Sequence, residues 1–261
     1  MKHKTLYVGY GFSLLALVVL RVCQLAFAME SATGFYKPEY ENFGFVSAVA
    51  IILSFAAITY FSFTDTDFSR REKESGKTAI FYILTAVGFI AKFAFSDLGA
   101  SASLISISTI SALLALLSAA VCIVDAYSLF VGKTAKNHFN ILFVVFWISE
   151  LITVFVRNND VSSLPERFYE TVSAALCILC SLYIVKDKEE MLTKTSSKIM
   201  VALSLITSAF CIMCSLPQLL LVISGNGNLL HAFSLSSVLY LTYGIFIPVY
   251  IFGTFTQKHK N

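Results

Sequence analysis

Long apolar stretches alternate with short polar segments along the whole chain. A helix rises about 1.5 Å per residue, so about 20 mostly apolar residues are needed to cross a hydrocarbon core about 30 Å thick. The stretches lack the polar and apolar alternation of the strands of a membrane barrel. Eight stretches are long enough, at residues 5–28, 43–63, 78–96, 103–131, 139–156, 167–185, 199–224 and 233–256. The pattern predicts an all-α integral membrane protein, a polytopic bundle of eight transmembrane helices forming a single domain over residues 1–261.

The composition agrees with this prediction and excludes three other classes of protein. Hydrophobic residues make up 57% of the chain and charged residues only 13%, whereas a soluble domain carries about 25% charged residues. The mean hydropathy is +0.77. A soluble globular domain, a disordered chain and a nucleic-acid-binding protein are therefore excluded, although the isoelectric point is about 8.5.

The first apolar stretch also has some features of a secretory signal peptide. It follows Lys2 and Lys4, and residues 26–28 (Ala-Phe-Ala) resemble a cleavage site. Arg21 interrupts the stretch, but the apolar residues on both sides of it are together long enough to cross a bilayer. We therefore expect residues 5–28 to remain as the first helix. Cleavage would leave seven helices and an N-terminus outside.

Basic residues are concentrated on one side of the predicted membrane. Lysine and arginine near the ends of membrane helices tend to stay in the cytoplasm. With the N-terminus inside, the inside segments hold most of the 19 basic residues: Lys2, Lys4, Arg70, Arg71, Lys73, Lys77, Lys133, Lys136, Lys186, Lys188, Lys194, Lys198, Lys258 and Lys260. The outside loops hold Lys37, Arg157 and Arg167. This asymmetry predicts cytoplasmic N- and C-termini, in a plasma membrane or a bacterial inner membrane.

The two halves of the chain resemble each other weakly. Residues 38–39 (Pro-Glu) are followed by Val-Ser-Ala at 46–48, and residues 165–166 (Pro-Glu) are followed by Val-Ser-Ala at 172–174. Halves of four helices would have the same orientation and be related by an axis along the membrane normal. One interpretation is a four-plus-four parallel repeat. The other is chance similarity between apolar helices rich in serine and alanine.

Several charged residues fall inside the predicted helices. A charge at the centre of a membrane helix costs about 2.5–3.5 kcal/mol, so such residues are usually paired or functional. Four of them lie in the outer half of the membrane, and their formal charges cancel: Arg21, Lys92, Glu150 and Glu170. They would line an outward-facing polar cavity that holds a zwitterionic or anionic solute or relays protons. Alternatively they are structural ion pairs, with Lys92 extending to the outer surface. Asp125, alone near the inner end of its helix, is a weaker candidate.

Two prolines are further weak candidates for a site. Pro217 and Pro248 lie within the predicted seventh and eighth helices. A proline frees a backbone carbonyl and kinks its helix, and interrupted helices mark many transporter sites. Small residues recur from Ser106 to Ala119, which predicts close helix packing there or contact with a partner subunit.

Thiols and imidazoles do not form a recognisable metal or cofactor site. All six cysteines fall in predicted helices: Cys23, Cys122, Cys177, Cys180, Cys211 and Cys214. The pairs 177–180 and 211–214 have C-x-x-C spacing and could converge on a soft metal. Thiols in apolar surroundings resist ionisation, however, and pack as small hydrophobic groups. The four histidines lie at tails or helix ends. We therefore expect no metal, no cofactor and no catalytic residue.

These observations favour a small-solute or ion transporter, or the membrane subunit of one. The first alternative is a non-catalytic membrane sensor, scaffold or partner protein, in which the charges only hold helices together. An intramembrane enzyme is least favoured, because no catalytic constellation is visible. The expected partners are the lipid bilayer, a small solute or ion and a helix-packing subunit, with no nucleic acid. No motif in the chain is specific to a family of known activity.

Overall fold

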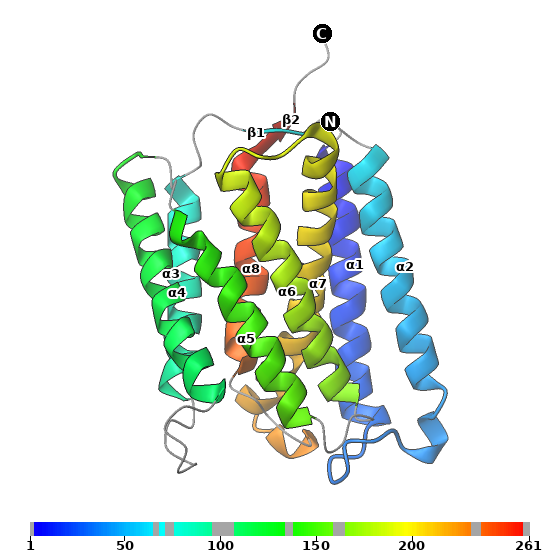
Figure 1. Cartoon of the computed structure of the whole chain (residues 1–261). Helices are drawn as coiled ribbons and strands as arrows, with labels where there is room; N and C mark the ends of the chain where they lie inside the picture. Colours follow the sequence, from blue (N-terminus) through cyan, green and yellow to red (C-terminus); the bar gives the residue numbers. More distant parts are fainter. Residues whose placement is uncertain are drawn as a thin grey trace.

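In the part of the chain that the structure describes, eight long helices run side by side as a bundle (Figure 1). The computed structural model describes residues 3–64, 68–70, 76–95, 107–133, 138–158, 165–230 and 236–257. The helices are α1 (His3–Cys23), α2 (Phe43–Thr64), α3 (Gly76–Ala94), α4 (Ile107–Phe130), α5 (Ile141–Asn158), α6 (Pro165–Lys188), α7 (Lys194–Ile223) and α8 (Ser236–Thr254). Each is long and apolar enough to cross a membrane, by length and composition. The predicted helical architecture is confirmed, with eight helices long and apolar enough to span a membrane among the residues described.

Short elements join or extend the long helices. They are the π-helix η1 (Gln24–Ala28), the 3₁₀ helices η2 (Pro38–Tyr40), η3 (His138–Asn140) and η4 (Gly227–Leu229), and the strands β1 (Phe68–Arg70) and β2 (Phe255–Gln257). The two strands pair antiparallel, with Ser69 opposite Thr256. Strand β1 lies outside the predicted spans, whereas β2 begins within the last two residues of the eighth, where α8 has already ended. Pairing satisfies backbone groups beyond the helix ends. The pair therefore ties the segment after α2 to the end of α8.

The helices alternate in direction, so α1 begins and α8 ends at the same end of the bundle (Figure 1). We call this end, uppermost in Figure 1, the terminal end. The opposite end is the distal end. The last turn of α3 and the first turns of α4, α6 and α8 therefore lie near the distal end, together with the end of α1.

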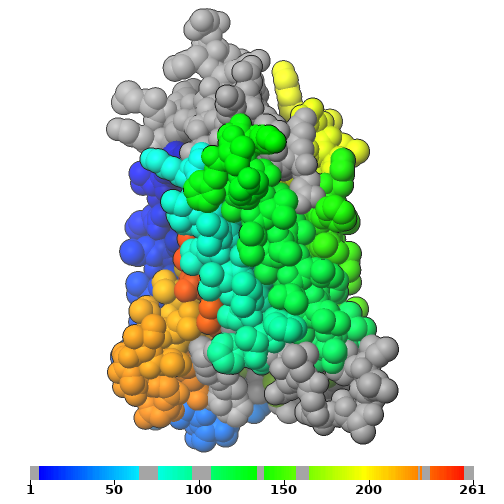
Figure 2. Space-filling view, turned by 90° about the vertical axis from the view of Figure 1, so that its left-hand side faces the viewer, coloured from blue at the N-terminus to red at the C-terminus, as the bar shows by residue number. Residues whose placement is uncertain are grey.

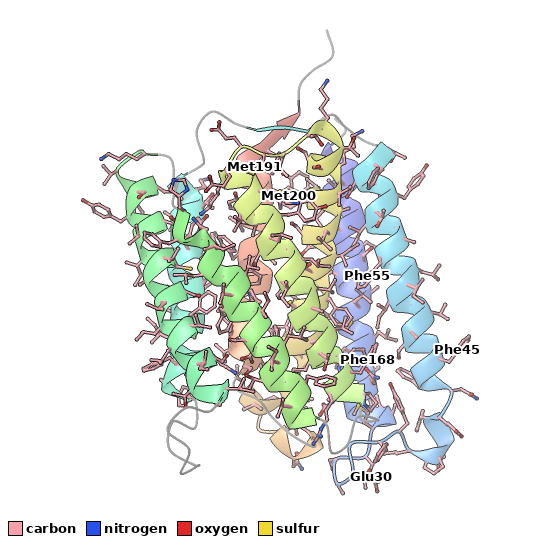
Figure 3. All side chains as sticks on the ribbon, viewed as in Figure 1. Glu30, Phe45, Phe55, Phe168, Met191 and Met200 are labelled. Carbon is pink, nitrogen blue, oxygen red and sulfur yellow. The ribbon has the colours of Figure 1, made fainter. Side chains whose placement is uncertain are left out.

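Helix α7 is the centre of the bundle and α2 is at its edge. Of the apolar stretch of α7, 72% is buried inside the bundle, whereas only 11% of the apolar stretch of α2 is buried. Helix α7 contacts α1, α2, α6 and α8, and α2 contacts α1 and α7. On α2, Phe45 points away from the bundle (Figure 3), whereas Phe55 packs against Phe210 of α7. One face of α2 therefore remains for contact with lipid.

Helix α8 is almost as enclosed as α7. The face in Figure 2 shows only a narrow strip of α8 between α1 and α3. The close contact of α8 with α3 depends on Gly88, because a methyl group there would lie 2.1 Å from Oγ1 of Thr242. Gly244 similarly allows α8 to approach Cys211 of α7. Because these two glycines have no Cβ atom, α8 can lie close to both α3 and α7.

The helix contacts do not reproduce the predicted four-plus-four repeat. The pair α1 and α2 would correspond to α5 and α6, and α3 and α4 to α7 and α8, and all four of these pairs are in contact. Helix α7, however, also packs on α1 and α2, whereas the corresponding contacts of α3 with α5 and α6 are not among the substantial ones in the part of the chain described. The repeat stays a prediction.

The boundary between α6 and α7 differs from the prediction. The predicted helices end at residue 185 and begin again at 199, but α6 continues to Lys188 and α7 begins at Lys194. Glu190 adopts a left-handed conformation with φ of 59°, and the Thr193 side chain accepts a hydrogen bond from the backbone N–H of Ser196, which caps α7. The connection is therefore a tight turn, and Lys188 belongs to a helix.

Candidate functional site

A buried ion pair lies near the distal end, between four helices. Nζ of Lys92 in α3 lies 2.7 Å from Oε1 of Glu150 in α5. It also donates a 2.9 Å hydrogen bond to Oγ of Ser236 in α8. The hydroxyl of Ser111 in α4 donates to Oε2 of Glu150 over 2.9 Å. The Glu150 side chain is 1% exposed and that of Lys92 is 13% exposed. We call these four residues the distal site.

Helix ends bring the distal site together. Ser236 begins α8, and Lys92 lies in the last turn of α3. Glu150 lies further from the end of its helix, α5, than Lys92 does from the end of α3, and its side chain is the more buried of the two. A charge in the apolar interior needs a partner, so Lys92 turns toward Glu150. The alternative expectation, that Lys92 extends to the outer surface, is wrong.

Arg21 lies in a second buried cluster, at the end of α1. Its Nη1 donates to Oε1 of Gln24 over 2.6 Å, and its Nη2 lies 3.5 Å from Oε1 of Glu166 in α6. The guanidinium carbon stands 4.7 Å from the ring centroid of Tyr169. The Arg21 side chain is 1% exposed. We call Arg21, Gln24, Glu166 and Tyr169 the arginine site.

The π-helix η1 and the following loop enclose the arginine site. Gln24 begins η1, and its amide donates to the hydroxyls of Tyr36 and Tyr169. Burial, and next the neighbouring Tyr169, raise the pKa of Tyr36 to about 12. Tyr36 therefore keeps its proton throughout the physiological range. A π-turn widens a helix and is frequent at functional sites.

The four predicted outer residues are divided between these two clusters. Lys92 and Glu150 form one pair, and Arg21 pairs with Glu166, which the sequence analysis did not single out. Glu170 lies one helical turn after Glu166 on α6. Arg21 and Glu150 thus have different partners.

A third buried cluster lies near the terminal end. Nζ of Lys188, the last residue of α6, lies 2.5 Å from Oδ2 of Asp125 in α4 and donates over 2.9 Å to Oδ1 of Asn140 in η3. Nζ also stands 5.0 Å from the ring centroid of Tyr82 in α3. The side chains of Asp125 and Lys188 are 1% and 2% exposed. We call these four residues the terminal site.

The terminal site corrects two expectations. Asp125 is not alone, because Lys188 pairs with it. Lys188 does not lie in a cytoplasmic loop, because α6 continues past the end of its apolar stretch and carries Lys188 into the bundle. Beside it, the Tyr250 hydroxyl of α8 donates to Oδ2 of Asp187 over 2.7 Å. The charges that mark the end of the apolar stretch are therefore partly structural.

The cysteines of the two C-x-x-C pairs meet between α6 and α7. The sulfur atoms of Cys177 and Cys211 lie 3.5 Å apart, and Sγ of Cys180 lies 3.5 Å from Oγ of Ser204. These thiols are free and buried. Among the residues described, no group of three or more His, Cys, Asp or Glu side chains is arranged to hold a metal ion.

The two prolines lie in different surroundings. Next to Pro217, the Gln218 side chain accepts a 2.7 Å hydrogen bond from Ser237, the neighbour of the distal-site serine. Pro248 has no N–H for the carbonyl of Gly244. That carbonyl accepts a 2.5 Å hydrogen bond from Ser208 of α7 instead. The residue after Pro217 thus bonds to the start of α8, whereas Pro248 frees a carbonyl that bonds α8 to α7.

Comparison with known proteins gives no further identification. No family model matches the chain, and neither does any curated protein or solved structure. The fold and the sites define only a class of protein. Over the residues described, it is a helical bundle with eight potential membrane-spanning helices and with charged residues paired in its interior.

Proposed function

We propose that the protein carries a small solute or ion across a membrane, alone or as the membrane subunit of a transporter. The distal site supports this proposal best. It holds Lys92 and Glu150 inside the bundle and draws side chains from α3, α4, α5 and α8. A solute that breaks the pair would change how these helices pack.

Stability alone does not account for an ion pair in this position. Removing two charges from water costs more than their attraction often returns, and apolar replacements of buried pairs are frequently neutral or stabilising. Apolar residues at positions 92 and 150 would also suit an apolar bundle. A role in binding explains why charged residues are present there.

The proposal includes an orientation and a location. The terminal end faces the cytoplasm, in a plasma membrane or a bacterial inner membrane, and the distal site opens to the outside. The bias of basic residues supports this orientation. The terminal site then lies on the cytoplasmic side, so a buried ion pair stands near each end of the path. The proposal also keeps the four-plus-four parallel repeat, in which α1 to α4 would correspond to α5 to α8.

The test is uptake by the protein reconstituted into liposomes, with a panel of labelled small solutes. Glu150→Gln keeps the size of the side chain and removes the charge that holds Lys92, so we expect uptake to fall at least about tenfold, which is about 1.4 kcal/mol. Glu41→Gln, at an exposed position just before α2, is the control and should transport normally. Normal uptake by a folded Glu150→Gln protein would contradict transport through this site.

A non-catalytic sensor or partner protein is the second candidate. It is favoured by the bonding of Glu150, because both carboxylate oxygens already have partners within the bundle. In that case Glu150→Gln and Arg21→Gln would lower stability, and the wild-type protein would take up no solute of the panel. The two candidates therefore differ in the behaviour of the unaltered protein.

A further inference from the structure

Two aromatic side chains in the core hold polar hydrogens that have no acceptor. Nε1 of Trp147 in α5 and the hydroxyl of Tyr240 in α8 are buried without a hydrogen-bond partner among the residues described. Their rings are neighbours, with centroids 5.4 Å apart. Buried polar groups almost always have partners, because leaving one unpaired costs free energy. Two such groups side by side therefore need an explanation.

Both groups lie just below the distal site, toward the middle of the bundle. Trp147 precedes Glu150 by three residues on α5, and Tyr240 follows Ser236 by four residues on α8. Residues three or four apart share a helix face. By the helical rise, the two aromatic residues lie about 4.5 and 6 Å deeper than their polar neighbours. The unpaired donors therefore adjoin the ion pair along α5 and α8.

The chemistry of this region selects a class of ligand. An indole N–H is a donor only, and a phenol readily donates, so both groups call for acceptor oxygens such as those of a carboxylate. Lys92 offers a third donor, and Glu150 offers acceptors to an ammonium group. The charges of Lys92 and Glu150 cancel, so an anionic or a cationic ligand would leave a net charge in the apolar interior. A ligand with both charges would not.

We infer that Lys92, Trp147, Tyr240 and Glu150 bind a small zwitterion of the amino-acid type. Its carboxylate accepts from Trp147, Tyr240 and Lys92, and its ammonium group donates to Glu150. This inference deepens the proposed function, because the bound zwitterion is the solute that the protein would carry.

The protein offers a direct measure of this binding. It contains one tryptophan, which is Trp147, so its intrinsic fluorescence reports on this region alone. The purified full-length protein is titrated with glycine, L-alanine and L-leucine, and then with their amides, which are cations, and their N-acetyl forms, which are anions. We expect a saturable change in Trp147 emission with at least one zwitterion. Both charged forms of that compound should bind at least about tenfold more weakly.

A pair of variants locates the binding. Tyr240→Phe removes the unpaired hydroxyl and keeps the ring, and we expect it to weaken zwitterion binding about tenfold. Tyr243→Phe is the matched control. The ring of Tyr243 also contacts Trp147, at 5.0 Å, but its hydroxyl already pairs with Ser181 at 2.5 Å. Tyr243→Phe should therefore bind the zwitterion like the unaltered protein.

The inference is overturned if no zwitterion changes the emission, if the N-acetyl form binds as tightly as the zwitterion, or if Tyr240→Phe binds normally. The comparison of charged forms uses the unaltered protein, so it decides the question even if a variant does not fold. Binding of a zwitterion without uptake would support this site and refute transport. Uptake of another solute, without zwitterion binding, would refute this ligand and leave transport in place.

Discussion

At the scale of single residues, Lys188 shows how strongly a buried charge depends on its partner. Its Nζ contacts Asp125 and Asn140 and stands 5.0 Å from the ring centroid of Tyr82, so three groups that stabilise positive charge surround the ammonium group. Removing Lys188 would take away the positive charge that pairs with the buried carboxylate of Asp125.

We therefore expect Lys188→Met to lower the free energy of unfolding by about 3–5 kcal/mol, the usual cost of breaking a buried pair on one side. Adding Asp125→Leu should recover much of this loss, because the second substitution removes the unpaired charge. Thermal unfolding of the purified protein measures both. Lys186→Met, two residues away and exposed, should cost about 1 kcal/mol or less. Equal losses at 186 and 188 would show that the pair does not matter.

The residues of the sites differ in how visible they are in the sequence. Glu150 and Lys92 are charged residues within apolar stretches, so the cost of burying a charge identifies them. Lys188 adjoins a run of other charged residues, and nothing in that run shows which one turns into the bundle. Trp147 and Tyr240 are ordinary residues for a membrane helix. Their lack of a partner is a property of three-dimensional packing.

At the scale of helices, the contact between α3 and α8 is the most sensitive to a single methyl group. A Cβ at position 88 would lie 2.1 Å from Oγ1 of Thr242, 3.2 Å from its Cβ and 3.4 Å from the backbone of Leu239. A new rotamer of Thr242 cannot relieve all three contacts, because its Cβ does not move with χ1. The two helices would have to separate.

Gly88→Ala is accordingly expected to destabilise the protein by about 1–3 kcal/mol, the usual cost of overpacking. Gly11→Ala is the matched control, since Gly11 also lies in a long helix and has nothing within 4 Å of the added methyl group. There the change should stabilise by up to about 1 kcal/mol, because alanine favours the helix. Thermal unfolding of the two variants should therefore shift in opposite directions, and a shared direction would argue against the close approach.

Hydropathy identifies all eight helices but not where the helical backbone stops. The apolar stretch in α6 ends before Lys186, and the helix continues to Lys188 because charged side chains at a helix C-terminus are compatible with helical backbone. The pairing of β1 with β2 depends on contact between segments far apart in the chain. The order of the helices around α7 has the same origin, so it too could not be predicted.

At the scale of the whole molecule, the proposed orientation in the membrane can be tested by labelling introduced cysteines. Ala32 is exposed in the distal loop after η1, and Lys133 is exposed beyond the end of α4 at the terminal end. In intact cells, a membrane-impermeant maleimide should label Ala32→Cys and should label Lys133→Cys only after the membrane is permeabilised. The native protein, whose six cysteines lie in α1, α4, α6 and α7, gives the background. The reverse labelling pattern would invert the proposed orientation.

The partner of Arg21 has a consequence for how the chain is made. Glu166 follows Arg21 by 145 residues, and α7, which packs on α1 and α2, follows later still. While the ribosome is still producing α2 to α5, Arg21 has the neutral side chains of Gln24 and Met29 as hydrogen-bond partners, and its anionic partner Glu166 has not yet been made. Assembly of the N-terminal helices is therefore completed only after α6 and α7 have been inserted.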